Sequence, residues 1–408
     1  MSASKHWLGI SLLGIIFIAA TTIAAFVTKL WVLTALPIGF LFGFFLQKGD
    51  LCGSSAFSEV ILMKDWRKVS GLWIAIVVSM LVFAVGSTLG WIQLNPKPMI
   101  WANYIIGGVV FGVGTVLAGG CISGCLYKSA TGNLNSIVAV IAMPFGIGLV
   151  EYGPLHGFFE SMKAKNIPAT GGGALSLPAV TGISYTALAV IFALITIVAV
   201  LALRANPKGG RPQAKSDPPS LERAMTRPWK PWQAGLAIGI LALAAYVSSA
   251  STGRNYPLGV THGVLFVQTL VTERDVKHVY EKPPAAKAAA PKPDNKQTAA
   301  SEPAKKKVVW WLVLLIGSLM LGSFTSGKLS GQAKLLPKPP EQTLVAILGG
   351  LMVGAGAAFA GGCVIGNILS GWALMSIGTI LFGIVVVLAN WTTTYFYLMG
   401  GKIRFGKK

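Results

Sequence analysis

Residues 107–124 read GGVVFGVGTVLAGGCISG, and residues 349–366 read GGLMVGAGAAFAGGCVIG. Nine of the eighteen positions are identical at a constant offset of 242 residues, including the whole AGGC tetrapeptide. One chain therefore contains two copies of an apolar, glycine-rich helix that ends in a cysteine. In membrane proteins, duplicated hydrophobic segments interrupted by glycine are the best sequence indication of a substrate site between two halves. The sequence thus predicts a functional site at Cys121 and Cys363.

The composition indicates a membrane protein. Of the 408 residues, 53% are hydrophobic and 12% are charged, whereas about 25% of a soluble domain is charged. Several apolar runs reach the roughly 20 residues that a helix needs to cross a bilayer. We predict an all-α polytopic membrane protein with about nine transmembrane helices, about four short re-entrant helices and an internal pseudo-two-fold repeat. The expected spans lie near residues 7–28, 71–92, 103–119, 133–150, 183–203, 232–249, 308–325, 341–360 and 372–398.

The organisation follows from two hydrophilic stretches between the apolar runs. Residues 1–205 form a first membrane half, which carries the Cys52 and Cys121 modules, and residues 206–231 form a basic linker rich in proline. Residues 232–275 start the second half, and residues 276–307 are a Lys/Ala/Pro linker whose bias predicts disorder. Residues 308–408 complete the second half with the Cys363 module and a basic tail.

The net charge of +21 does not indicate nucleic-acid binding. Basic residues gather at 204–230, 277–307 and 402–408, beside the expected spans, as the positive-inside rule describes. We therefore predict a cytoplasmic C-terminal tail and a cytoplasmic linker at 204–231, with the 281–307 linker on the same side. The partner of these charges is expected to be the anionic surface of a lipid bilayer.

The four cysteines, Cys52, Cys121, Cys125 and Cys363, all lie in apolar, glycine-rich segments. None lies in the hydrophilic linkers, where a disulfide framework would appear. A buried cysteine often packs as a small hydrophobic side chain, but that role does not explain a cysteine at the same place in both copies. Cys121 and Cys125 share a helix face, as a soft-metal pair would. Because the repeat mate of Cys125 is Asn367, we predict no metal site and no cofactor.

The breaks before the short helices are suited to anion binding. Helix N-termini present unpaired N–H groups and the positive end of the dipole, and adjacent glycines let a ligand approach the backbone. A thiol adds a weak, polarisable donor that suits a sulfur-bearing anion. Nearby cations could compensate the charge of an anion, although each has the alternative of snorkelling to the interface. The candidate binding residues are Cys52, Cys121, Cys363, Gly119, Gly120, Gly361, Gly362, Lys48, Lys128 and Arg254.

The paired AGGC modules and the segment GFLFGFFLQKGDLCGSSAF (residues 39–57) resemble the YeeE/YedE family of bacterial sulfur-compound transporters. The resemblance implies thiosulfate uptake across the inner membrane by an hourglass-like bundle of helices. It also implies that Cys52, Cys121 and Cys363 pass the anion along by S–H···S hydrogen bonds. A small cytoplasmic TusA-like sulfur-carrier protein is an expected partner. The chain departs from the family at Gly53, where an aromatic residue is common, at Cys125, and in its long second linker.

Two other functions stay open from the sequence alone. The same cysteines could serve a permease for a selenium species or a soft metal such as Cu(I). A membrane thiol oxidoreductase or sulfurtransferase would need a CxxC pair or a low-pKa thiol with a resolving partner. This chain has CxxxC at Cys121 and Cys125 instead, so we expect a transporter and not an enzyme.

Overall fold

The computed structural model describes residues 7–169, 172–205, 221–273, 276–280, 306–335 and 339–401. The described chain is mainly helical, with one pair of short strands. Its elements, in order, are α1 (Trp7–Thr28), the 3₁₀ helix η1 (Trp31–Thr34), α2 (Ala35–Gly49), α3 (Gly53–Met63), α4 (Arg67–Thr88), α5 (Trp101–Leu117), α6 (Ile122–Ala130), α7 (Leu134–Glu151), α8 (His156–Lys163), α9 (Leu177–Thr181), α10 (Tyr185–Ala205), α11 (Leu221–Thr226), α12 (Pro231–Ser251), α13 (Thr261–Thr272), β1 (Lys277–Val279), β2 (Lys307–Val309), α14 (Trp310–Leu329), α15 (Pro340–Phe359), the π-helix η2 (Val364–Leu369), α16 (Ser370–Ala373), α17 (Ile377–Thr393) and the π-helix η3 (Thr394–Leu398).

The helices confirm an all-α polytopic membrane protein. Ten helical segments within the described residues are long and apolar enough to cross a bilayer. The sequence predicts about nine, because it divides residues 31–63 into two half-length helices, whereas that stretch is apolar enough as a whole to count as the tenth. Only 11% of the span windows of α1 and α10 is buried inside the protein. These two helices therefore have most of their apolar surface available to lipid.

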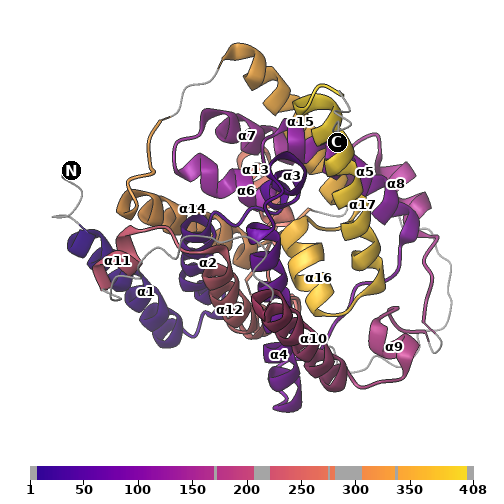
Figure 1. The fold of residues 1–408 in the computed structure, drawn as a ribbon, viewed down its shortest axis with the longest axis horizontal. Coiled ribbons are helices and arrows are strands. Elements are labelled where there is room, and N and C mark those ends of the chain that lie inside the picture. The colour runs from indigo at the N-terminus through magenta and orange to yellow at the C-terminus, as the bar shows by residue number, and fades with distance from the viewer. Residues whose placement is uncertain are drawn as a thin grey trace.

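The short helices α3, α6 and α13 lie among the longer ones, and α1 lies on the outside (Figure 1). The long helices pack as pairs: α2 on α14, α5 and α7 on α15, and α4 on α12. Small residues allow such close approach in membranes. A Cβ added to Gly43 or Gly322 would overlap the backbone of the facing helix. Glycines therefore set how closely α2 and α14 pack.

The contact between α5 and α15 is reciprocal. A Cβ at Gly107 would lie 2.7 Å from the Gly356 carbonyl oxygen, and in the exchanged pair a Cβ at Gly114 would lie 3.0 Å from the Gly349 carbonyl oxygen. Likewise, Gly107 faces the Ala360 backbone and Gly349 faces the Ala118 backbone. Each contact thus has a counterpart in which the two 18-residue copies are exchanged.

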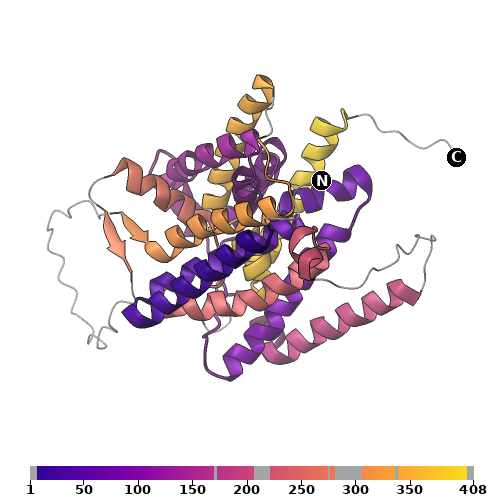
Figure 2. The same ribbon diagram turned by 90° about the vertical axis from the view of Figure 1, so that its left-hand side faces the viewer.

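The ends of the two linkers lie at opposite ends of the helix bundle. In Figure 2, strands β1 and β2 lie at the left, while α11 and η3 lie toward the right. The two strands pair in parallel, with Lys277 opposite Lys307. The Lys306 ammonium pairs with Glu273 and lies 4.4 Å from the Tyr152 ring.

The prediction that both linkers lie on the same side is therefore wrong. The reason is that α12 is the single full-length helix among the described residues between them, since α13 is too short to cross back. The strands also occupy both ends of the stretch 276–307 that the sequence predicts to be disordered. Residues 206–220, 281–305 and 402–408, which include most of both linkers and the basic tail, lie outside the described residues.

Candidate functional site

Three cysteines each occupy the residue just before a short helix. Cys52 precedes α3, Cys121 precedes α6 and Cys363 precedes η2, and all three have an extended backbone. The free N–H groups that begin each short helix are therefore next to a thiol. All three side chains are fully buried and carry no disulfide. The short helices begin where the sequence predicts them.

The two AGGC turns end their helices in the same way. Gly119 and Gly361 adopt the left-handed conformation, with φ of +69° and +59°. The N–H groups of Gly120 and Gly362 each donate to a carbonyl one turn back, at 3.0 and 2.8 Å. This is the Schellman pattern, which favours glycine at the left-handed position. The glycine pairs therefore have a structural role in the turns, whatever they contribute to binding.

Two of the thiols lie close together. The Sγ atoms of Cys52 and Cys121 are 3.9 Å apart, and Cys121 Sγ lies 3.4 Å from the Ser123 hydroxyl. A Cβ at Gly124 would overlap Cys52 Sγ. The glycine that closes the first AGGC motif therefore leaves the space that the second sulfur occupies.

The Cys363 turn contacts the Cys52 segment through the residues that directly follow these two cysteines. A Cβ at Gly53 would lie 2.5 Å from Val364 Cγ1, so the first residues of α3 and η2 touch. Gly366, the repeat mate of Gly124, has nothing within 4 Å of an added Cβ. The second AGGC turn is thus open at the position where the first is filled by a thiol.

Cys125 has a structural role that its repeat mate shares. The Cys125 thiol donates to the Ala118 carbonyl at 3.8 Å, and the Asn367 amide donates to the equivalent Ala360 carbonyl at 3.0 Å. Asn367 also donates to the Gly362 carbonyl at 2.9 Å. Both side chains satisfy a carbonyl at the end of the preceding helix, which otherwise lacks an intrahelical partner.

In each AGGC turn, a lysine ammonium donates a hydrogen bond to the carbonyl of the left-handed glycine. Lys128 Nζ donates to the Gly119 carbonyl at 2.9 Å. Lys97 Nζ donates to the Gly361 carbonyl at 2.6 Å and to Asn367 Oδ1 at 2.7 Å. Lys97 lies in the segment between α4 and α5 and was not among the residues predicted from the sequence.

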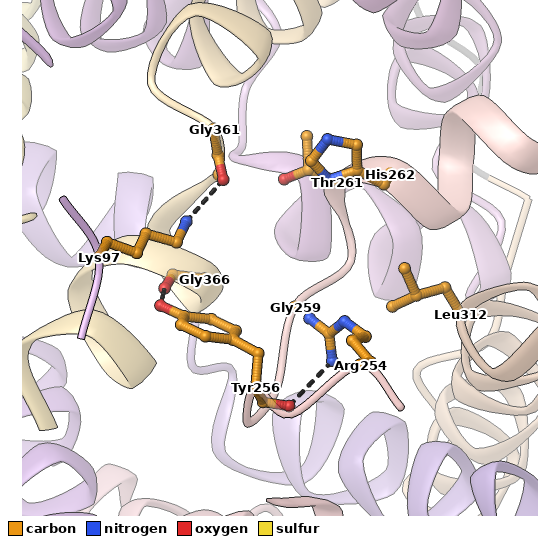
Figure 3. A pocket seen from close by; sticks show the side chains of 10 residues that line it. Lys97, Arg254, Tyr256, Gly259, Thr261, His262, Leu312, Gly361 and Gly366 are labelled. Atoms are coloured by element: carbon orange, nitrogen blue, oxygen red, sulfur yellow. Dashed lines mark hydrogen bonds between the residues drawn. The ribbon is translucent and has the colours of Figure 1, made fainter. Parts of the chain in front are cut away.

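A cavity of about 190 Å³ opens beside the second AGGC turn (Figure 3). We call it the Arg254 cavity. Of the predicted residues, it contains Arg254, Gly361 and Gly362. A water molecule occupies about 30 Å³ of liquid volume, so the cavity has room for a small hydrated anion. Its full lining is Lys97, Arg254, Tyr256, Gly259, Thr261, His262, Leu312, Gly361, Gly362 and Gly366.

The Arg254 cavity is electropositive. Within the described residues, no Asp or Glu lines it, and neither Lys97 nor Arg254 forms an ion pair. The Lys97 ammonium and the Arg254 guanidinium lie 5.0 and 5.6 Å from the centre of the Tyr256 ring. Burial, together with the charge of Arg254, lowers the pKa of Lys97 to about 7. Two cations without a carboxylate in the described lining of the cavity favour an anionic ligand.

Tyr256 connects the cavity to the second AGGC module. Its hydroxyl donates to the Gly366 carbonyl at 2.6 Å, and its own carbonyl accepts from Arg254 at 3.1 Å (Figure 3). His262, also in the lining, contacts Glu151 at 2.9 Å. The break before α13, which has no cysteine, therefore brings a cation and an aromatic ring to the Cys363 turn.

Lys48 lies elsewhere, because its ammonium donates to the Met225 carbonyl of α11. It borders a second cavity, of about 320 Å³, which we call the Asp50 cavity. There Lys68 bridges Asp50 and Glu59 at 2.5 Å each. Asp50 also accepts from Tyr127, on the Cys121 side, at 2.7 Å.

Sequence reasoning missed Lys97, Tyr256 and His262. None of them lies in the AGGC repeat, and Lys97 precedes α5 in a stretch without helical periodicity. The one available signal was composition. Lys97 and Arg254 are both cations between apolar segments, and Arg254 was selected because it lies in the break before a short helix.

A family model described as sulphur transport matches residues 48–392. The chain belongs to this family. It is 28% identical over 372 residues to the thiosulfate transporter TsuA of Spirochaeta thermophila, covering 89% of this chain and 98% of that protein. It is 26% identical to TsuA of Escherichia coli, covering 89% and 94% of the two chains.

A third relative matches a shorter region. The "probable transporter YedE" of Escherichia coli is 35% identical over 104 residues, a quarter of each chain. The resemblance to the YeeE/YedE family is therefore confirmed. This member of the family is a membrane transporter and not an enzyme.

Proposed function

We propose that this protein takes up thiosulfate, or a closely related sulfur anion, across the bacterial inner membrane. The anion would pass along a path lined by Cys52, Cys121 and Cys363. Both nearly full-length relatives are named thiosulfate transporters. The observation that carries the proposal is the 3.9 Å separation of the Cys52 and Cys121 sulfurs, each at the start of a short helix.

The chemistry of the path suits a soft anion. A dianion loses much of its hydration on entering the membrane, and a single deep site would hold it too tightly to release it. Several weak thiol donors in series, each helped by a helix N-terminus, allow both binding and release. A neutral thiol can donate to the terminal sulfur of thiosulfate, whereas a thiolate would repel it. We therefore propose that the three cysteines act as neutral donors and not as nucleophiles.

We also propose that α3, α6, α13 and η2–α16 are re-entrant half-helices, related in pairs by a pseudo-two-fold axis. The contact between Gly107 and Gly356 and its repeat mate between Gly349 and Gly114 support an axis that passes between α5 and α15. A break in a membrane helix is tolerated where it lines a wet cavity or is buried in protein. The hourglass-like shape would follow from two such pairs that meet at the thiols.

For orientation, we propose that the Arg254 cavity faces the periplasm and the Asp50 cavity the cytoplasm. The basic residues around α11 and the C-terminal tail support this assignment. Gly361, Gly362 and Arg254 would contact the arriving anion, and Gly119, Gly120 and Lys128 the departing one. Lys48 would act at the cytoplasmic mouth. A TusA-like sulfur carrier would collect the product there.

The test is uptake of thiosulfate labelled at its outer sulfur, measured in cells and in reconstituted vesicles. The Cys121→Ala, Cys363→Ala double variant should lose uptake while its thermal unfolding in detergent stays close to that of the native protein. Cys125→Ala is the matched control and should keep most of its uptake. Near-normal uptake by the double variant would refute the path.

The same assay separates the alternatives. Sulfate and selenite serve as competitors, and stronger competition by selenite than by unlabelled thiosulfate would indicate a selenium permease. A persulfide or mixed disulfide trapped on Cys52 or Cys121 during turnover would indicate sulfurtransfer instead of permeation.

A further inference from the structure

The two AGGC turns each hold a lysine, but the lysines are not related by the repeat. Gly119 and Gly361 are repeat mates, and their carbonyls accept from Lys128 and Lys97. At the offset of 242, however, the mate of Lys128 is Ser370. Lys128 comes from the short helix after its turn, whereas Lys97 comes from a different part of the chain. The same hydrogen bond from a lysine to the left-handed glycine therefore forms in both turns, although the two lysines are not repeat mates.

This contact has an electrostatic purpose. The C-terminal ends of α5 and α15 carry the negative ends of their helix dipoles. An anion that approaches either turn would meet these carbonyl groups before it reaches a thiol. An ammonium on the last carbonyl reverses the local sign, and it leaves other N–H donors of the same lysine for a ligand.

We propose that Lys97 is a further binding residue for the transported anion and the counterpart of Lys128 at the other end of the thiol path. One cation then stands at each end of the path, with Cys52, Cys121 and Cys363 between them. This inference rests on the proposed function and adds to it a residue that determines the affinity on the side of the Arg254 cavity.

The surroundings of Lys97 suit this role. Its ammonium donates to two neutral oxygens, those of Gly361 and Asn367. The other cation that lines the cavity is Arg254, whose guanidinium lies 5.6 Å from the centre of the Tyr256 ring. The two cations therefore repel each other, and a dianion between them would relieve that repulsion. A small oxyanion with a terminal sulfur fits both the charge and the adjacent Cys363 turn.

Lys128 lies toward the opposite cavity. The residue before it, Tyr127, donates to Asp50, which lines the Asp50 cavity. An anion that leaves the thiols in this direction would meet the Lys128 ammonium last. Removing Lys97 should therefore weaken capture of the substrate, whereas removing Lys128 should slow its release or its passage.

The experiment measures initial rates of labelled thiosulfate uptake into intact cells, so that only the outer face receives substrate. Lys97→Met should raise the KM about tenfold or more, because one charge-assisted hydrogen bond to the anion is lost. Lys97→Arg should restore most of the affinity. Lys128→Met should lower the maximal rate by a larger factor than it raises the KM. Lys328→Met, at an exposed lysine of α14, is the matched control and should behave like the native protein.

Two outcomes would overturn the inference. A KM for Lys97→Met within twofold of the native value, in a variant with native thermal unfolding, would show that Lys97 does not bind the anion. Identical kinetic effects of Lys97→Met and Lys128→Met would show one shared site instead of two ends of a path. Failure of the proposed function is distinguishable, since the native protein would then show no uptake that depends on Cys121 and Cys363.

Discussion

The first AGGC turn has a second thiol beside it, whereas the second turn has a cavity. Gly124 and Gly366 occupy equivalent positions, yet Gly124 faces Cys52 Sγ and Gly366 faces open space. The backbone turns are the same, so the difference comes from the preceding break. In the first half that break supplies Cys52, and in the second half it supplies Arg254 and Tyr256. Two similar backbone turns thus carry different groups: the first AGGC turn has a thiol pair, and the second has a cationic cavity.

The comparison suggests a division of work between the two halves. The cavity with two cations would select for charge, and the thiol pair would select for sulfur. A hard oxyanion such as sulfate satisfies the first requirement but not the second. Substitutions at equivalent positions of the two copies should therefore have different effects.

The largest difference is expected between Gly124→Ala and Gly366→Ala. In Gly124→Ala the new methyl group must displace Cys52 Sγ, which should destabilise the protein by about 1–3 kcal/mol and reduce uptake about tenfold or more. Gly366→Ala meets no atom within 4 Å, so its stability should stay native while the narrower cavity raises the KM. Uptake kinetics give the KM of each variant, and thermal unfolding in detergent gives its stability. Equal loss of stability in the two variants would contradict the asymmetry.

A smaller difference is expected between Asn367→Ala and Cys125→Ala. Asn367 donates two hydrogen bonds and accepts a third from Lys97, so its loss should cost about 1–3 kcal/mol. It should also raise the KM, because Lys97 loses an anchor. Cys125 makes one weak thiol contact, and its replacement should cost less and leave the KM unchanged. A raised KM in Cys125→Ala would show that the fourth thiol also takes part in transport.

The smallest effect is expected in the pH profile. The pKa of Lys97 is lowered to about 7 by burial and by Arg254, and the other titratable groups beside it are Tyr256, His262 and Cys363. Lys97 is therefore charged below pH 7 and loses its charge above it, while thiosulfate keeps its charge. The KM should rise between pH 6 and pH 8, by roughly tenfold at most for one titrating group.

Lys97→Arg supplies the control for this profile, because arginine stays charged over the whole range. Its KM should be flat between pH 6 and pH 8. A pH dependence that persists unchanged in Lys97→Arg would assign the titration to another group.

The sequence predicted the helices well, and the partners of their side chains poorly. The apolar runs and the AGGC repeat were enough to place the long helices and the short helices after Cys52, Cys121 and Cys363. Hydropathy and glycine spacing are local properties, so a single chain records them. The sequence placed Lys128 about two helical turns after Cys121, but it did not show that the ammonium folds back onto the Gly119 carbonyl.

Long-range contacts could not be predicted in this way. Lys97 and Gly361 are 264 positions apart, and no repeat or motif connects them. Lys48 looked equivalent to Lys128 because both lie near a cysteine, yet its ammonium contacts Met225 of α11. The side of the second linker was mispredicted because its lysines were given more weight than the number of spans before it.

The parallel pairing of β1 and β2 has a practical consequence for engineering. The chain leaves β1 after Val279 and rejoins β2 at Lys307, beside the strand that it left. Adjacent strands lie about 5 Å apart and rise about 3.3 Å per residue, so the connection has to bridge only about 10 Å. Its length is therefore independent of the transmembrane helices. A reporter domain inserted there would lie on the face of the Arg254 cavity. A reporter fused at the C-terminus would lie on the opposite face. A protein that carries both reporters would allow access to each face of the membrane to be measured on one molecule.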